Sequence, residues 1–215
     1  MFRRQRASVV PPPDPALMRL VETTGATARA AADLPAAIAV VLSEVAGATG
    51  WTVGHAWVPA GEPGAWVSSG LWFPDDGIGL GALRRVCAEA PPAPARGHLA
   101  LALHLEGTQW VGDLAALAGT PMHDAAVAAG VAAAVACPAY AHGRPVALLE
   151  WYLPSTRRPG PDVAHVLGHL AGVLAEVAER PPVTAAVPAQ RSRESVRDTL
   201  RWVTEDGVLS RLTLA

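Results

Sequence analysis

Residues 50–58 read GWTVGHAWV, and residues 69–72 read SGLW. In the first stretch every second side chain is large and the side chains between them are smaller, which is typical of a β-strand. The turn sequence GEPG at residues 61–64 separates this stretch from a second predicted strand over residues 65–73. The two stretches therefore predict two consecutive strands at the start of a sheet.

A second group of motifs lies in the other half of the chain. In order, these are WVGD at residues 110–113, GV at 130–131, CP at 137–138 and GRPVALLEWY at 143–152. Residues 131–136 and 146–153 are predicted strands joined through His142 and Gly143. We therefore expect them to pair as an antiparallel hairpin.

The motifs of both halves resemble, in order and spacing, those of the GAF domains found in bacterial sensor kinases and other signalling proteins. That family opens its sheet with a GWxVGHxW-like strand and a GLW strand. A W-[IV]-x-D segment, a helix ending A-G-[LV] and a P…G…V-[AV]-x-L-E-[FW]-[FY] hairpin follow. The resemblance spans residues 33–180. It implies an α+β fold: a GAF/PAS-like antiparallel sheet with flanking helices on one face and a pocket on the other.

Composition fits a compact globular protein. Hydrophobic residues make up 51% of the 215 residues and charged residues 17%, and the formal net charge is −2. Nothing in this balance attracts nucleic acid or an anionic membrane surface. No run of eighteen apolar residues predicts a membrane span, and the basic, proline-rich start does not read as a signal peptide. We therefore expect a cytoplasmic protein.

The helical segments divide the chain into four parts. Residues 1–32 are predicted to hold a leader and a helix over 15–30, and residues 33–180 the GAF-like domain. A linker at 181–190 and an amphipathic segment at 191–215 follow. Within the domain the predicted helices are 34–48, 80–90, 121–130 and 162–180, and Asp33 caps the first of them. Residues 99–105 fit a strand or a helix.

Four residues are candidates for contact with a ligand. Trp72 and Trp110 match the GLW and W-V-x-D positions, which the resemblance places near the mouth of the cavity. His123 lies upstream of Gly130, in a region that the resemblance places in the lining of the cavity in cofactor-binding relatives. His104 is the fourth candidate. A haem held by His123 is a less favoured alternative, and the cofactor, if there is one, is not identified.

Other polar residues favour plainer roles. His165 and His169 are four positions apart on a predicted helix, but no third ligand accompanies them, so we expect no metal site. Glu150 lies in an otherwise apolar strand, which predicts burial with a partner and a perturbed pKa. Asp113 is expected to cap the segment that follows it. Residues 98–102 read HLALA where the family commonly has GLPGR, which predicts an altered or closed pocket.

No enzyme motif is evident in the chain. The G-x-x-x-x-G-K, G-x-S-x-G and G-x-G-x-x-G patterns are absent. Some GAF-fold proteins reduce methionine sulfoxide with cysteines, and Cys87 and Cys137 could meet in space, but their flanks resemble no such motif. The sequence therefore predicts that the protein is not an enzyme.

The function implied is that of a sensory or regulatory domain of bacterial signal transduction that binds a small molecule. The alternative is a protein-interaction or dimerisation module whose cavity is filled by its own side chains. The apolar residues Val196, Leu200, Val203 and Leu209 need a covering partner. We therefore expect a homodimer built on the terminal helices, and a signalling partner protein.

Overall fold

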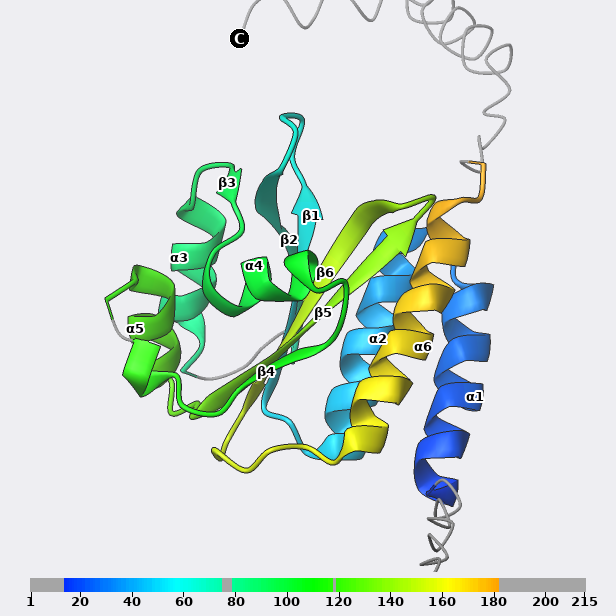
Figure 1. Ribbon diagram of the computed structural model, residues 1–215, viewed down its shortest axis with the longest axis horizontal. Coiled ribbons are helices and arrows are strands. Elements are labelled where there is room, and N and C mark those ends of the chain that lie inside the picture. Colours follow the sequence, from blue (N-terminus) through cyan, green and yellow to red (C-terminus); the bar gives the residue numbers. More distant parts are fainter. Residues whose placement is uncertain (1–13, 75–78, 118, 182–215) are drawn as a thin grey trace, which may run out of the picture. The chain divides into compact units, whose positions relative to one another are not determined.

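The computed structural model describes residues 14–74, 79–117 and 119–181. These residues form an antiparallel sheet of six strands in the order β3-β2-β1-β6-β5-β4. The strands are β1 (Val53–Pro59), β2 (Ala65–Phe73), β3 (Ala93–Pro94), β4 (Gln109–Val111), β5 (Ala133–Ala141) and β6 (Arg144–Leu153). Both strand pairs expected from the sequence are present, and β1 joins them by pairing with β6 (Figure 1).

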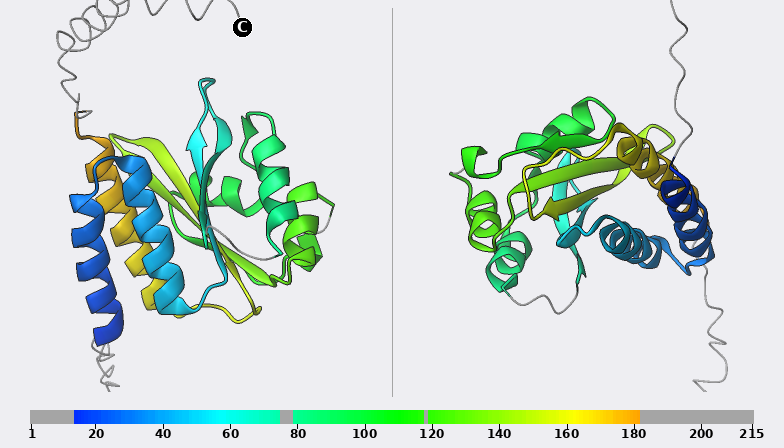
Figure 2. Two further views of the ribbon diagram at one scale, coloured as in Figure 1. Left: turned by 180° about the vertical axis from the view of Figure 1, so that it is seen from behind. Right: turned by 90° about the horizontal axis from the view of Figure 1, so that it is seen from below.

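Two helices pack on one face of the sheet and a third packs against both of them; we call the side formed by these three helices the three-helix face (Figure 2). They are α1 (Pro15–Ala30), α2 (Leu34–Thr49) and α6 (Pro161–Ala178). Asp14 and Asp33 accept hydrogen bonds from the free backbone amides at the starts of α1 and α2, and a proline occupies the first turn of each helix. Gly50 ends α2 with a φ of 70°, which a residue with a side chain rarely adopts. All three helices had been predicted.

Shorter helices lie over the opposite face, which we call the pocket face. They are α3 (Gly81–Glu89), α4 (Gly97–His104), the 3-10 turn η1 (Ala115–Leu117) and α5 (Pro121–Ala128). The ambiguous residues 99–105 thus belong mainly to a helix. Asp113 accepts hydrogen bonds from the amides of Ala115 and Ala116 at 3.0 and 3.3 Å, so its predicted capping role is confirmed.

Alternation along β6 separates the two faces. Leu149, Trp151 and Leu153 point into the core beneath the three helices. Leu148 and Tyr152 belong to the core of the pocket face. Glu150 is two positions from each of these residues along the strand, so its carboxylate also lies on the pocket face.

Some predictions concern residues outside the described ranges. The leader, almost all of the linker and the amphipathic segment at 191–215 are among them. Helix α1, predicted as part of the N-terminal extension, packs against α2 and α6, and its Leu20 and Ala28 lie in their shared core. Within the described ranges, no helix is both long enough and apolar enough to cross a membrane.

Candidate functional site

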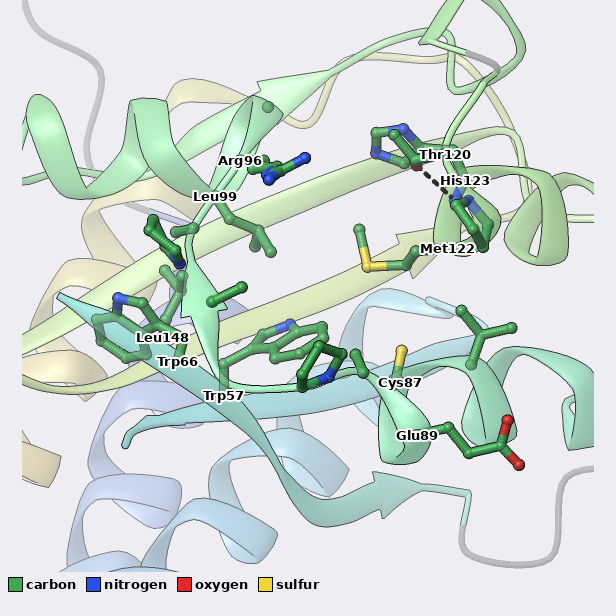
Figure 3. A pocket seen from close by; sticks show the side chains of 18 of the residues that line it. Trp57, Trp66, Cys87, Glu89, Arg96, Leu99, Thr120, Met122, His123 and Leu148 are labelled. Atoms are coloured by element: carbon green, nitrogen blue, oxygen red, sulfur yellow. Dashed lines mark hydrogen bonds between the residues drawn. The ribbon is translucent and has the colours of Figure 1, made fainter. Parts of the chain in front are cut away.

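A cavity of about 680 Å³ lies on the pocket face, between the sheet and the segment that runs from α3 to α5. Trp57, Trp66 and Leu148 line it from the sheet. Cys87, Leu99, Met122 and His123 are among the residues that line it from the helices (Figure 3). The altered stretch at 98–102 therefore does not close the pocket: it forms most of α4, whose Leu99 is one of the walls.

A buried carboxylate lies directly behind the pocket wall. Glu150 is fully buried and is bound through both of its oxygens. His98 Nε2 lies 2.7 Å from Oε1, and the indole Nε1 of Trp57 donates to Oε2 at 3.1 Å. His55 Nδ1 lies 3.9 Å from Oε2. The carboxylate thus links the strand β6 to the pocket-lining Trp57 and to the start of α4.

The environment of Glu150 keeps it ionised. Burial by itself raises the pKa of this carboxyl, but the hydrogen bonds and charges of His55 and His98 outweigh burial and hold the pKa far below its usual range. Burial disfavours the charged form of His55 and so lowers its pKa. Glu150 acts to raise this pKa, but its effect is smaller than that of burial. The prediction of a buried Glu150 with partners and a perturbed pKa is therefore confirmed.

A stack of rings extends from this cluster towards the edge of the sheet. The rings of His55 and Trp72 are stacked with centroids 3.9 Å apart, and His55 meets Trp57 edge-on at 4.8 Å. The guanidinium of Arg84 lies 5.5 Å from the centre of the Trp72 ring. His55 Nε2 is also 2.9 Å from the hydroxyl of Ser68. These contacts fix the aromatic residues that support the pocket.

The two cysteines lie on opposite faces of the sheet. Cys87 lines the pocket, whereas Cys137 belongs to the core of the three-helix face. The sheet separates them, so they cannot form a disulfide in this fold. Burial raises the pKa of Cys137 to about 11. Burial, assisted by the charge of Glu150, raises that of Cys87 further, so both thiols stay protonated at neutral pH.

Of the four predicted ligand residues, His123 lines the pocket. Trp72 packs on His55 and is not a lining residue, and His104 is exposed at the end of α4. Trp110 lies against the core of the three-helix face, with the guanidinium of Arg158 5.5 Å from its ring centre. Its ring leaves no room for a side chain at Gly112, which explains the glycine of the WVGD motif.

Sequence reasoning missed the importance of His55 and His98. His55 lies within a strand motif and reads there as one more large residue of the alternating pattern. His98 lies in the stretch that departs from the family pattern, and this departure was the available signal. Among the described residues no group of three His, Cys, Asp or Glu side chains could hold a metal ion, and His165 and His169 are both exposed.

No protein-family model and no curated protein matches the chain, but solved structures match its fold. The GAF domain of the phosphoenolpyruvate-protein phosphotransferase from Acinetobacter is similar with a TM-score of 0.60 and 8% sequence identity. The match covers 81% of this chain and 99% of that domain. The chain has a GAF fold. The predicted fold class, an α+β GAF-like antiparallel sheet with flanking helices, is confirmed.

Two further GAF-fold neighbours are enzymes. The free methionine-R-sulfoxide reductase of Neisseria meningitidis, solved with its substrate, has a TM-score of 0.59 and 20% identity. That match covers 81% of this chain and 96% of the reductase. The fRMsr of Staphylococcus aureus, also solved with its substrate, has a TM-score of 0.54 and 14% identity, over 80% of this chain and 99% of its own. At these identities the likeness concerns the fold.

These neighbours overturn the prediction that the protein is not an enzyme. That prediction rested on missing motifs for nucleotide binding and serine hydrolysis, and such motifs do not separate enzymes from binding domains within this fold. The reductases share the fold of this chain and were solved with their substrate. The absence of those motifs is therefore no argument against catalysis in this chain. A test of its function should include an assay for methionine sulfoxide reduction.

Proposed function

We propose that this GAF domain is a sensory or regulatory module that recognises a small molecule in the pocket between the sheet and helices α3 to α5. The observation that carries the proposal is the open cavity of about 680 Å³, whose size and largely apolar lining suit a small organic ligand. A cavity of this volume favours ligand binding over the alternative of a pocket filled by its own side chains. We keep His123, which lines it, as a proposed contact.

The rigid support of the wall favours binding as well. Trp57 is held by Glu150 from behind, and His98 is bound to the same carboxylate. A wall fixed before the ligand arrives loses less side-chain entropy on binding. A rigid pocket of this kind suits a sensor, because occupancy then changes the stability of the surrounding helices without rebuilding the site.

A thermal-shift screen with a metabolite panel, together with native mass spectrometry of the purified protein, tests this proposal. We expect at least one compound to raise the melting temperature, because a ligand that binds the folded state stabilises it. The Ala95→Trp variant places an indole in the pocket lining and should abolish that shift. Ala88→Trp, on the exposed side of α3, is the matched control and should retain it. A blank panel and a blank mass spectrum would contradict the proposal.

The reductase neighbours supply a competing function, and one observation favours including it: Cys87 lines the pocket. Free methionine-R-sulfoxide should be incubated with the protein and dithiothreitol as the reductant, and loss of the sulfoxide measured. Turnover that disappears in Cys87→Ser would replace the sensory proposal by a thiol-dependent reductase. The raised pKa of Cys87 argues against this outcome, because the thiolate is the nucleophile. An absorbance scan near 400 nm tests the haem alternative in the same sample.

For assembly, we retain the homodimer through the terminal helices and a signalling partner in the cytoplasm as proposals. Helix α1 uses Leu20, Thr24 and Ala28 to pack within its own chain, so a second subunit would meet its other side or the residues beyond Pro181. Light scattering on the full chain and on a chain that ends at Arg180 tests this. A monomeric full-length protein at micromolar concentration would contradict the dimer.

A further inference from the structure

We propose that the pocket selects ligands that carry a weakly hydrated organic cation, such as a trimethylammonium group, seated against Trp57 and Trp66. This inference rests on the proposed function, because it assigns a chemical class to the ligand of the same pocket.

Two tryptophans form one side of the pocket. Trp57 and Trp66 come from the paired strands β1 and β2, and both are more than nine-tenths buried. Figure 3 shows them apart from Met122 and His123, which lie on the helix α5 side of the cavity. The face of an indole carries a negative electrostatic potential and is the best aromatic partner for a cation. The wall therefore favours a positively charged group over an uncharged group of the same shape.

A buried carboxylate stands behind this wall. Glu150 accepts a hydrogen bond from the indole of Trp57, so its carboxylate is in direct contact with a side chain that the ligand would touch. The charge also reaches another lining residue, since the electrostatic effect of Glu150 adds to burial in raising the pKa of Cys87. A buried charge is screened by salt much less than an exposed one. A cation on the wall would gain from both the rings and the carboxylate.

The charged residues that line the pocket do not reverse this preference. Arg96 and Glu89 are exposed lining residues of opposite sign, and solvent screens both. Burial lowers the pKa of His55, which disfavours its positively charged form. His98 donates to Glu150 through Nε2, and His123 lies across the cavity from the two indoles.

The apolar lining decides which cation fits. A metal ion needs several oxygen or nitrogen ligands, and the described residues offer no such cluster. A primary ammonium is strongly hydrated and would lose its water without enough acceptors in a wall of Trp, Leu, Met and Pro. Methyl groups reduce that hydration and supply apolar surface. The chemistry of the wall thus points to a methylated ammonium.

Choline and 3,3-dimethyl-1-butanol form a matched pair of probes, because they differ in the charged nitrogen and have nearly the same shape. We expect choline to bind at least about tenfold more tightly in ligand-observed NMR titrations at pH 7.5. 3,3-Dimethylbutanoate, the anion of similar shape, should bind more weakly than the alcohol. Equal affinity for choline and the alcohol, or no binding of either at millimolar concentration, overturns the inference.

Variants locate the effect. Glu150→Gln keeps the shape of the side chain and removes its charge, so the preference for choline over the alcohol should fall severalfold while binding of the alcohol persists. Trp66→Leu removes an indole without disturbing the buried carboxylate and should also reduce the preference, which covers the case that Glu150→Gln fails to fold. Glu44→Gln, an exposed carboxylate on α2, is the control and should leave the preference unchanged. An unchanged preference in both Glu150→Gln and Trp66→Leu overturns the inference.

Failure of this inference is distinguishable from failure of the proposed function. An uncharged or anionic hit from the metabolite panel, blocked by Ala95→Trp, would leave a ligand-binding pocket and remove its preference for cations. A blank panel would remove the proposed function itself.

Discussion

The two faces of the same sheet are built on different principles. In the part of the chain that the structure describes, the three-helix face is filled mainly by Leu, Val, Ala and Trp side chains and holds no buried charged side chain. The pocket face holds a buried carboxylate and three buried imidazoles beside a large open cavity. Successive side chains of β6 point alternately into the core of the three-helix face and into that of the pocket face. The comparison indicates that one face supplies the stability that allows the other to hold charge and empty volume, both of which are unfavourable for folding.

Removing the same side chain from each face gives the largest expected contrast. Trp151 is fully buried, packs on Trp51 with ring centroids 5.9 Å apart and donates to the carbonyl of Leu42 at 3.4 Å. We expect Trp151→Ala to lower the free energy of unfolding by about 3–5 kcal/mol. Trp66→Ala should lower it less, because Trp66 already borders an open cavity. Urea unfolding followed by far-UV circular dichroism measures both; a larger loss for Trp66→Ala would refute the contrast.

Acid should weaken the pocket face before the other. The folded protein lowers the pKa of His55, so the unfolded state binds its proton first and stability falls as the pH drops through the usual imidazole value of 6.5. The pKa of Glu150 is also lowered on folding, so a second loss begins as the pH falls below the usual carboxyl value of 4.5. Urea midpoints between pH 8 and pH 4 measure these losses.

A variant separates the two acid steps. As the pH falls below 4.5, Glu150→Gln should lose less stability than the wild-type protein, because the amide does not titrate. Constant wild-type midpoints from pH 8 to pH 5 would contradict the contribution assigned to His55.

A smaller difference between the two faces is expected in the rate at which their cysteine thiols react. The chain has two cysteines, so the variants Cys87→Ser and Cys137→Ser each leave one thiol. Both native thiols should react slowly at pH 8 with methyl methanethiosulfonate, since burial raises the pKa of each. Cys87 should still be modified faster, because its sulfur lies on the wall of a cavity. Mass spectrometry of timed samples checks the order, and faster modification of Cys137 would mean that the three-helix face opens first.

The smallest effect is expected from an ion pair on the outside of the three-helix layer. Arg29 of α1 binds Glu176 of α6 with Nε and Oε2 2.7 Å apart, and both side chains are largely exposed. Solvent and salt screen such pairs, so Arg29→Gln should leave the urea midpoint almost unchanged at 0.15 M salt. A clear loss would show that α1 is held to α6 by charge rather than by its buried Leu20 and Ala28.

The four long strands of the sheet and the helices α1, α2 and α6 followed from local patterns, whereas the short strands β3 and β4 were not predicted. Period-two alternation in β1 and β2, caps such as Asp33 and the apolar stripe of α6 are each set by neighbouring residues, so the sequence was sufficient to predict them. The strand β5 was longer than expected because Cys137 to Ala141 continue the ladder opposite the start of β6.

The candidate site was only partly predictable. The burial of Glu150 could be inferred because a carboxylate in an apolar strand needs a partner. Its partners could not, because His98 is 52 and Trp57 93 positions away along the chain. Whether Trp110 faced the pocket depended on the register of the short strand β4, where a shift of one residue exchanges the two faces. The family motif alone does not specify that register.

Apart from Trp57, Trp66 and Leu148 of the sheet, every residue that lines the pocket comes from one stretch of chain between Val86 and His123. Helices α1, α2 and α6 contribute nothing to the lining. Substitutions and length changes within this stretch can therefore reshape what the pocket accepts while the long strands and the helices α1, α2 and α6 continue to fold. In descendants of one ancestral gene, ligand preference can diverge rapidly there while the remainder of the domain changes slowly.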